Sequence, residues 1–482
     1  MTRARSSGSG TSAAPAGAPR PPSRTTLTGW GRTAPTNATV RLVDSDSALV
    51  ALLAALGPRG AIARGLGRCY GDAAQNAGGS VLDMTPHAGI GPLRHEPTGT
   101  WVDLAGGTSL DRVMRELVPL GYFVPVTPGT RYVTAGGAFA SDIHGKNHHR
   151  DGSFSQHVDS LHLRTTTTQH TLTPADERFW ATAGGMGLTG VIESLRVRLR
   201  PIETSQMLVD TYRAVDLDAC MAAMTDDDTR FDYSVAWIDL VARGSRLGRS
   251  VITSGQHATL SNLDRSAALD PLSYRADITV RAPRWAPNGL LRPLTIRAFN
   301  EVWFRKAPAA RHTGLESIPT FFHPLDMVEG WNTLYGSAGF LQYQFVVPFG
   351  AEKTLRTIVE AMSNARCASF LAVLKRFGAG HGKGLLSFPI GGWTLALDIA
   401  ASRADPALFD DLDRLVLDAG GRVYLAKDSR ARPDMIAAMY PDLPRWRAIA
   451  DELDPHHNFT SDLDRRLALR RPQPAPRVAS AQ

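Results

Sequence analysis

Residues 64–72 read Arg64-Gly65-Leu66-Gly67-Arg68-Cys69-Tyr70-Gly71-Asp72, and Asn76-Ala77-Gly78-Gly79 follows shortly after. This glycine cluster comes directly after a short apolar run that the pattern predicts as a strand. Closely spaced glycines after a strand can present consecutive backbone N–H groups to phosphate oxygens, and the flanking arginines add positive charge. The spacing matches neither GxxxxGK[ST] nor a strand–GxGxxG–helix unit, so an ordinary glycine-rich turn is the alternative.

Two further glycine-dense segments follow in the first 200 residues. Residues 128–149 read PGTRYVTAGGAFASDIHGKNHH, and residues 179–192 read FWATAGGMGLTGVI. A metal site is one interpretation of the three histidines in the first of them, but His148 and His149 are adjacent and point apart on a strand or helix, so we expect none. The third segment alone would favour a tight connection without a ligand. Three such loops on one lobe, however, suggest a long pyrophosphate cofactor.

The surrounding sequence predicts a mixed α+β protein. Short apolar runs predict strands at 61–63, 81–83, 101–104, 158–163 and 191–199, with helices at 47–56 and 109–118, the second ending at Pro119. Further on, the patterns predict strands at 234–240, 339–348, 393–399 and 423–426, and helices at 353–365, 406–418 and around Tyr440 and Trp446. Residues 205–421 therefore suggest a second, mixed lobe.

Composition and charge exclude several classes of protein. The chain has 482 residues, of which 43% are hydrophobic and 21% charged, so it is neither fibrous nor wholly disordered. No run approaches the roughly 18 apolar residues of a membrane span, and the N-terminus has no apolar core of a secretory signal. The two ends carry nine arginines and no acid, so residues 26–464 have a net charge of −2. A nearly neutral body argues against a nucleic-acid interface, whereas basic tails could touch anionic lipid or simply be solvated.

Lysine is rare, with 6 lysines among 53 basic residues. Most positive charges in this chain are carried by arginine. A position that has lysine instead can therefore indicate a need for a compact ammonium group, whose pKa is lowered when it is buried. Lys306 and Lys353 are the two that we assign to chance retention on the surface. The others are Lys146, Lys375, Lys383 and Lys427. The three widely spaced cysteines predict neither a disulfide framework nor a zinc site.

Taken in order, these segments resemble the flavin domain of the vanillyl-alcohol-oxidase superfamily, and within it the 2′-oxidases of decaprenylphosphoryl-β-D-ribose. The similarity runs from about Gly29 to Arg466. It rests on RGLGRCYGDAAQNAGG, DIHGKNHH, FWATAGGMGLTG, FFHPLDM, FLQYQF, LSFPI-GGW, YLAKDSR and DPHHNFTSDL. Several of these motifs are long and rare elsewhere, so the resemblance is specific.

The resemblance implies a two-part FAD-binding domain of the PCMH type with an inserted substrate domain built on an antiparallel sheet. The expected boundaries are a disordered tail at 1–25, the FAD domain at 26–204, the substrate domain at 205–421, a segment returning to the FAD domain at 422–470 and a disordered tail at 471–482. It implies non-covalent FAD, with His144 touching the cofactor only by packing or hydrogen bonding. The implied cofactor-binding residues are Arg64, Gly65, Leu66, Gly67, Arg68, Cys69, Tyr70, Pro128, Gly129, Thr130, Thr134, Gly136, Gly137, Asp142, Ile143, His144, Asn147, Ile192 and Tyr424.

The resemblance also assigns the chemistry. Lys427 matches the family's active-site lysine, either as the base that takes the alcohol proton or as a cation that binds the hydroxyl or the flavin. A salt bridge with Asp428 is the structural alternative. Tyr70 would relay the proton or stack on the ribose. Gln342 and Gln344 share one strand face. The implied substrate residues are His144, Lys146, Trp237, His323, Gln342, Gln344, Lys375 and Lys427, although core packing is the stronger interpretation of Trp237.

Three positions depart from the family's pattern. Ala396 stands where members of the family have a cysteine, Phe322 where they have tyrosine, and Thr394 where they have asparagine. These changes bear on the substrate more than on the flavin.

The expected activity is FAD-dependent oxidation of the 2′-hydroxyl of polyprenyl-phosphoryl-β-D-ribofuranose to a ketone, by a protein peripheral to the plasma membrane. A quinone is a possible electron acceptor, and an NADH-dependent ketoreductase would complete the epimerisation to the arabinose donor. The alternatives are a soluble alditol or aldonolactone oxidase that uses oxygen, and a binding protein on the same scaffold without flavin.

Overall fold

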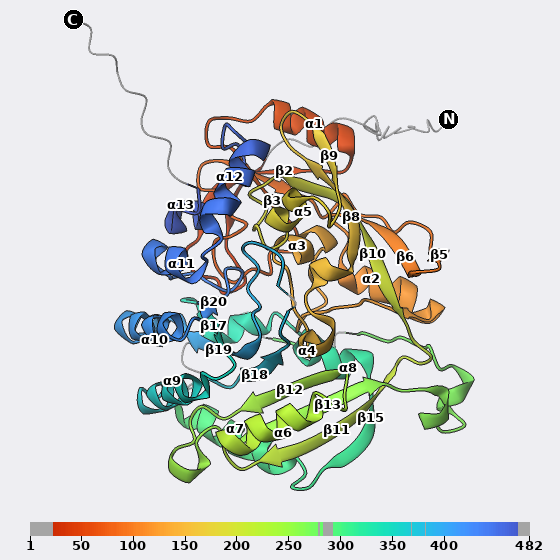
Figure 1. Ribbon diagram of the computed structural model, residues 1–482, viewed down its shortest axis with the longest axis vertical. Coiled ribbons are helices and arrows are strands. Elements are labelled where there is room, and N and C mark those ends of the chain that lie inside the picture. The colour runs from red at the N-terminus through yellow and green to blue at the C-terminus, as the bar shows by residue number, and fades with distance from the viewer. Residues whose placement is uncertain (1–22, 278–279, 283–292, 368, 381, 471–482) are drawn as a thin grey trace, which may run out of the picture.

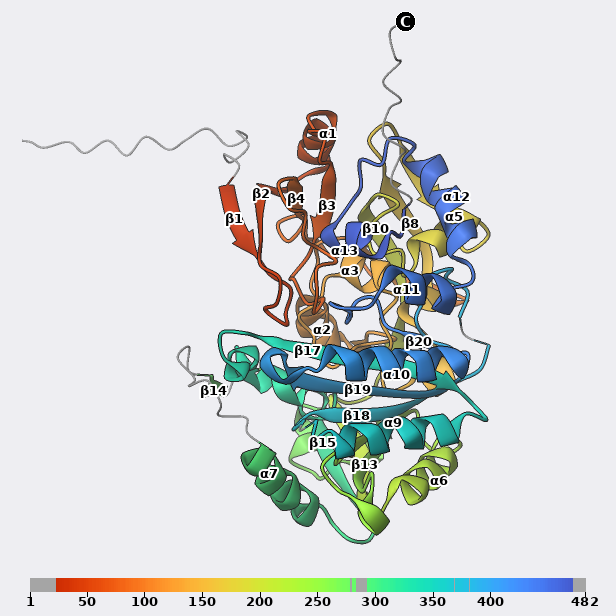
Figure 2. The same ribbon diagram turned by 90° about the vertical axis from the view of Figure 1, so that its left-hand side faces the viewer.

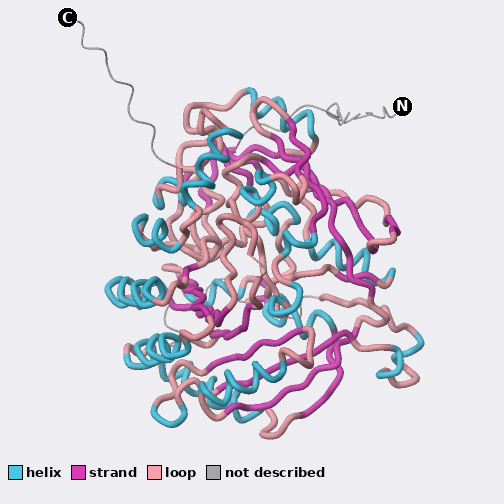
Figure 3. Tube along the Cα trace, in the orientation of Figure 1, coloured by secondary structure: helices cyan, strands magenta, loops and turns pink. Residues whose placement is uncertain are grey.

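The computed structural model describes residues 23–277, 280–282, 293–367, 369–380 and 382–470. They form two lobes, one built by both ends of the described chain and one by its middle (Figure 1). Figure 3 shows that the region between the lobes consists mostly of loops. Within the described residues, no helix combines the length and apolar character needed to cross a bilayer.

The first lobe contains two sheets. The smaller one has the order β1 (Ser23–Leu27), β2 (Thr36–Leu42), β4 (Ser80–Asp83), β3 (Ala61–Arg64), with β2 and β3 both parallel to β4. The larger has the order β5 (Arg94–Glu96), β6 (Gly99–Ala105), β10 (Val191–Pro201), β8 (Val158–Arg164), β9 (Gln169–Leu172), and β7 (Tyr122–Phe123) pairs with the end of β10. The predicted strands of this region are thus confirmed, with boundaries shifted by up to two residues.

Helices of the first lobe begin where short polar side chains cap them. Ser45 Oγ accepts from the backbone N–H of Ala48 ahead of α1 (Asp46–Ala54), and Ser109 does the same ahead of α2 (Leu110–Leu117). As expected, α2 ends just before Pro119, which lies in the first turn of a short 3₁₀ helix at Val118–Leu120. The remaining helices are α3 (Ala135–Ala140), α4 (His148–Asp151) and α5 (Glu177–Thr182).

The second lobe is an antiparallel sheet of eight strands. Their order is β15 (His312–Ser317), β11 (Gln206–Ala214), β13 (Ser250–His257), β12 (Tyr233–Ile238), β18 (Ala372–Phe377), β19 (Gly392–Ala400), β17 (Phe340–Pro348), β20 (Arg422–Val423). Three helices cover one face of this sheet, α6 (Leu217–Asp227), α9 (Glu352–Asn364) and α10 (Pro406–Asp418) (Figure 2). The other face is turned toward the first lobe.

Several shorter elements complete the second lobe. They are α7 (Pro293–Lys306), α8 (Ile318–Phe322), the 3₁₀ helices at Pro324–Met327 and Trp331–Tyr335, and the two-stranded parallel pair of β14 (Val280–Arg281) with β16 (Val328–Glu329).

The C-terminal segment returns to the first lobe, where α11 (Pro433–Met439), α12 (Leu443–Leu453) and α13 (Asp462–Leu467) lie beside its sheets and helices (Figure 1). Phe459 forms a bridge with Ala61 of β3. Two expectations need correction. Residues 23–25, assigned to a disordered tail, belong to β1, and the strand expected at 423–426 ends at Val423 because residues 425–427 form a turn. Residues 1–22 and the expected tail at 471–482 lie outside the described residues.

The α+β class with a large antiparallel sheet is therefore confirmed.

Candidate active site

A cavity of about 1080 Å³ lies between the glycine-rich loops of the first lobe and the open face of the eight-stranded sheet. Ligand cavities commonly measure about 300–1,000 Å³, so this one has room for an unusually large ligand. The structure brings most of the sequence-predicted site residues to its wall. They are Arg64, Gly65, Leu66, Gly67, Arg68, Cys69, Tyr70, Pro128, Gly129, Thr130, Thr134, Gly136, Gly137, Ile143, His144, Lys146, Ile192, Trp237, Gln342, Gln344, Lys375, Tyr424 and Lys427.

Glycine is required where these loops pack on one another. A Cβ on Gly65 would lie 2.3 Å from Thr134 Oγ1 of the second loop, and one on Gly71 would lie 2.1 Å from the backbone oxygen of Asp428. Gly67 has a φ of +65°, a conformation that side chains with a Cβ rarely adopt. Gly129, by contrast, lines the cavity with nothing within 4 Å of a Cβ, so its free side is open to a ligand.

The two arginines of the first loop are held by the protein's own groups. Arg64 donates to the backbone oxygens of Thr28 and Ala74, at 2.8 and 2.9 Å. Arg68 stacks on Trp30, with its guanidinium carbon 3.8 Å from the ring centroid, and donates to the backbone oxygen of Tyr132. Both therefore supply positive charge from fixed positions at the cavity wall.

Lys427 lies at the junction of the two lobes. Its ammonium nitrogen is 3.9 Å from the ring centroid of Tyr70. Gln342 Nε2 lies 3.1 Å from the hydroxyl of that tyrosine and donates to Asp398 Oδ1 at 2.6 Å. Gln342 and Asp398 sit directly opposite each other on β17 and β19, so the strand register fixes this pairing. A salt bridge from Lys427 to Asp428 is not found in the described structure, where that carboxylate instead pairs with Arg466 at 2.8 Å.

Burial changes the protonation of three cavity lysines. Loss of hydration, together with the positive charges of Lys427 and Lys146, lowers the pKa of Lys375 to about 7. Burial likewise lowers the pKa of Lys146 to about 8. Lys427 has a pKa below its ordinary value because of burial, partly offset by the carboxylate of Asp398. Asp398 in turn has a raised pKa, chiefly because it is buried.

His144 also lines the cavity, and its burial favours the neutral imidazole. Its Nε2 is 3.0 Å from Gln344 Nε2, and the same amide donates to Thr394 Oγ1 at 3.2 Å. Burial lowers the pKa of His144 well below its usual value, and Lys375 is the next largest cause. Its Nδ1 is buried and has no hydrogen-bond partner among the described residues.

Three expected ligand contacts are not at the cavity wall. Asp142 is buried and accepts from the backbone N–H of Ser155 and from Ser387 Oγ. Asn147 donates to the backbone oxygen of Pro125 at 2.9 Å. His323 is fully buried with its Nε2 2.9 Å from Thr127 Oγ1. These side chains hold the loops in place, a role that sequence spacing cannot distinguish from ligand contact.

Other residues of the site were missed from the sequence. Lys306, assigned to chance retention, lines the cavity together with Asp326. Asp326 accepts from the backbone N–H of Arg131 at 2.7 Å and from Thr130 Oγ1 at 2.8 Å, so it joins the second lobe to the second glycine loop. The sequence does contain a signal for Asp398, because an acidic residue within the mostly apolar strand TLALDIA is unusual and indicates a special role.

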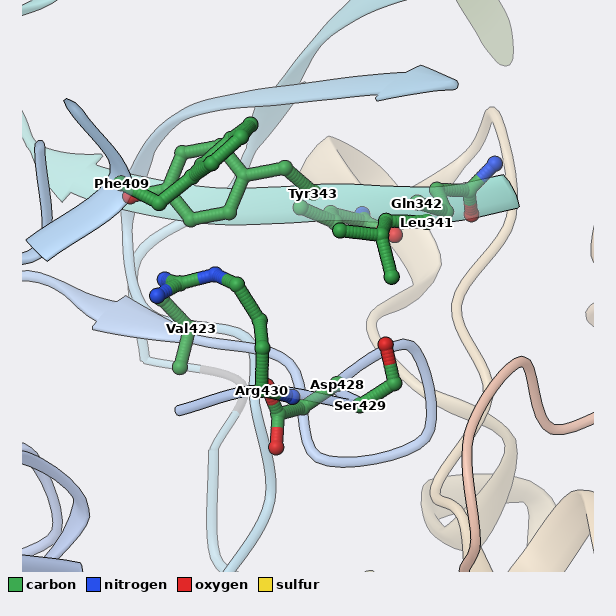
Figure 4. Close-up of a pocket in the computed structure, with 9 residues that line it drawn as sticks. Leu341, Gln342, Tyr343, Phe409, Val423, Asp428, Ser429 and Arg430 are labelled. Carbon is green, nitrogen blue, oxygen red and sulfur yellow. The ribbon is translucent and has the colours of Figure 1, made fainter. Parts of the chain in front are cut away.

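The loop that carries Lys427 is anchored by Arg430, which lies three residues further along the chain. Figure 4 shows a smaller pocket between this loop and β17, with the side chain of Arg430 extending toward Phe409 and Tyr343. Arg430 pairs with Asp413 of α10 at 2.6 Å, and Tyr343 donates to the same carboxyl group at 3.0 Å. These contacts fix the position from which Lys427 projects.

The cavity wall fits a flavin dinucleotide. It combines glycine backbone from two loops, the fixed charge of Arg68, the open side of Gly129 and the unpaired Nδ1 of His144, which can meet the polar and apolar parts of such a cofactor. Within the described residues, no three His, Cys, Asp or Glu side chains are arranged to hold a metal ion.

Comparison with known proteins agrees with this interpretation. Residues 38–172 match the model of an FAD binding domain. The chain is 43% identical to decaprenylphosphoryl-β-D-ribose oxidase of Mycolicibacterium smegmatis over 452 residues, covering 92% of this chain and 97% of the relative. It is 41% identical over 372 residues to an uncharacterized protein in the mprA 5′ region of Streptomyces coelicolor, covering 75% of this chain and all of that protein. The chain therefore belongs to the decaprenylphosphoryl-β-D-ribose oxidase family of FAD-dependent oxidoreductases.

Proposed function

We propose that this protein oxidises the 2′-hydroxyl of decaprenylphosphoryl-β-D-ribofuranose to a ketone, with FAD bound non-covalently. The observation that carries the proposal is the meeting of Lys427, Tyr70 and Gln342 in a cavity that the glycine-rich loops also line. The similarity to decaprenylphosphoryl-β-D-ribose oxidase of Mycolicibacterium smegmatis supports the choice of substrate. When bound, FAD supplies the two-electron acceptor that alcohol oxidation requires.

The glycine loops would hold the cofactor. Gly65, Gly67, Gly136 and Gly137 bring the backbone to the cavity, and Tyr424, Ile143 and Ile192 add further wall.

Lys427 would take the hydroxyl proton. Burial lowers its pKa, so more of the neutral amine is present near neutral pH than for a hydrated lysine. Gln342 and Tyr70 would orient the hydroxyl, since both line the cavity beside this amine and are tied to each other.

Lys146 and Lys375 would receive the phosphate. Both ammonium groups are buried in the cavity wall without an ion-pair partner within 4 Å in the described part of the chain. Their lowered pKa values reflect that missing partner, and the singly charged phosphodiester of the substrate would supply it and raise both pKa values.

The proposal extends to the neighbouring reactions. The substrate would be lipid-anchored, which implies action at a membrane surface. A quinone is a suitable acceptor for the electrons, and an NADH-dependent ketoreductase would consume the keto sugar.

Anaerobic mixing with a polyprenyl-phosphoryl-ribose tests the proposal. We expect the visible flavin absorbance to bleach, and we expect acid precipitation of the protein to release the yellow cofactor into the supernatant. No bleaching with this substrate, or bleaching with free alditols instead, would reject the assignment.

A further inference from the structure

Helix α7 carries four large apolar side chains that are partly or mostly exposed. Leu294 is 79% exposed, Val302 67%, Phe299 45% and Trp303 44%. Soluble proteins rarely expose several large apolar side chains on one short element, so this face indicates a binding surface.

The spacing arranges the exposed side chains in two neighbouring lines along α7, of which the second also touches the protein through Phe370 and the cavity wall. Leu294, Ala298 and Val302 follow at four-residue intervals, and Phe299 and Trp303 form a neighbouring line, with ring planes nearly parallel and centroids 6.1 Å apart. We call Leu294, Ala298, Phe299, Val302 and Trp303 the outer face of α7.

The inner face of α7, formed by Ile296 and Asn300, packs against the rest of the protein. Ile296 is buried, and Asn300 is fully buried with its Nδ2 donating to Asp239 Oδ1 at 2.8 Å. These buried side chains hold α7 in place, and Phe299 adds an edge-on ring contact to Phe370.

This outer face continues into the cavity. Trp303 and Lys306, at the C-terminal end of α7, line the cavity, as do the next two residues, Ala307 and Pro308. An apolar chain that leaves the cavity at this end would run directly onto α7.

Basic side chains border the outer face. Arg297, Arg305 and Lys306 are exposed, and the acid between them, Glu301, is already paired with Arg249 and Arg305. An apolar face bordered by cations is typical of helices that lie in the interface of an anionic bilayer.

We propose that the outer face of α7 docks onto an anionic lipid bilayer and positions the cavity mouth to receive a lipid-linked substrate. The choice of a bilayer over a protein partner rests on the basic border and on continuity with the cavity, and the lipid character of the substrate rests on the proposed function. A second copy of the chain is the competing occupant.

Vesicle binding by the full-length flavoprotein tests this surface without any substrate. Extruded vesicles of phosphatidylglycerol and phosphatidylcholine are sedimented with the wild type, with Leu294→Asp/Val302→Asp, and with Val215→Asp. Val215 is 65% exposed and lies between β11 and α6, so it matches Val302 in type and exposure. We expect binding to fall at least ~10-fold in the α7 variant and to change less than ~2-fold in the control.

Several results would overturn the proposal. These are equal binding by the α7 variant and the wild type, no vesicle binding by the wild type, or a concentration-dependent dimer that the α7 substitutions abolish. Unchanged flavin absorbance and melting temperature exclude misfolding as the cause of weaker binding.

A second measurement separates this inference from the proposed function. The α7 variant should oxidise a short-chain, water-soluble polyprenyl-phosphoryl-ribose at the wild-type rate but a long-chain substrate in vesicles more slowly. Loss of both rates would contradict a docking role. If even the wild type leaves the soluble substrate unoxidised, the proposed function fails while the vesicle result still decides the docking surface.

Discussion

At the scale of single residues, the chemistry of this site depends on burying lysines. Four of the six lysines line one cavity in a chain that otherwise uses arginine. Arginine would stay charged in such a place, whereas the pKa of a buried lysine falls toward neutrality. The rarity of lysine in the sequence therefore pointed to the site, although it could not separate Lys306 from Lys353. Both are exposed, but only Lys306 of the two lines the cavity.

Replacing Lys427 with methionine should stop substrate oxidation while leaving the flavin bound. The change keeps the length of the side chain but removes the amine, and loss of a positioned base costs about 10²–10⁴-fold in rate. The measurement is the rate of flavin bleaching under anaerobic single-turnover conditions. Lys353→Met, at an exposed lysine of α9, should match the wild type. Undiminished reduction in Lys427→Met would remove this residue from the mechanism.

Asp398→Asn should move the pH dependence of flavin reduction. If Lys427 acts as the neutral amine, the rate rises with pH through its pKa, and the Asp398 carboxylate raises that pKa. Asparagine keeps an acceptor for Gln342 but removes the charge, so the rising limb should shift to lower pH. The pH profile of the bleaching rate measures this shift. A rate that instead falls with rising pH would show that Lys427 works as a cation.

At the scale of elements, periodicity predicted several of the longer strands and helices, missed others such as β11 and β13, and did not predict the contacts between them. The alternation of Gln342 and Gln344 placed both on one face of β17, and the structure confirms this. That Asp398 lies opposite Gln342 depends on the register of β17 with β19, which no local pattern encodes. The resemblance also implied ligand contacts for Asp142, Asn147 and His323, whose side chains instead hydrogen-bond within the protein.

Gly71→Ala should damage the site through loop packing. A Cβ there would lie 2.1 Å from the backbone oxygen of Asp428, so the first glycine loop and the Lys427 loop would have to separate. We expect the free energy of unfolding to drop by about 1–3 kcal/mol or more, together with slower flavin reduction. Thermal unfolding and single-turnover bleaching measure the two effects. Gly57→Ala is the control, because nothing lies within 4 Å of a Cβ at that position. Equal melting temperatures for both variants would contradict the packing argument.

At the scale of the whole molecule, the site exists only where the two lobes meet. Loops of the first lobe supply the glycines, the sheet of the second lobe supplies Gln342 and Lys375, and the returning segment supplies Lys427. Gly65 and Lys427 are 362 positions apart in the sequence and yet share one wall. Single-sequence patterns carry no information on such long-range placement. The resemblance to a known family, rather than the patterns, predicted which segments would converge.

One residue should show how strongly the lobes depend on each other. Asp326 of the second lobe accepts from Arg131 and Thr130 of the second glycine loop, and its removal leaves the buried N–H of Arg131 without a partner, at a cost of about 1–3 kcal/mol. Asp326→Ala should therefore lower the melting temperature and the fraction of protein that retains FAD through gel filtration. Since a ligand that binds only the folded state stabilises it by mass action, added FAD should restore part of the lost stability. Asp411→Ala, at an exposed ion pair of α10, should change neither quantity. Full FAD retention by Asp326→Ala would mean that the glycine loop holds its shape without the second lobe.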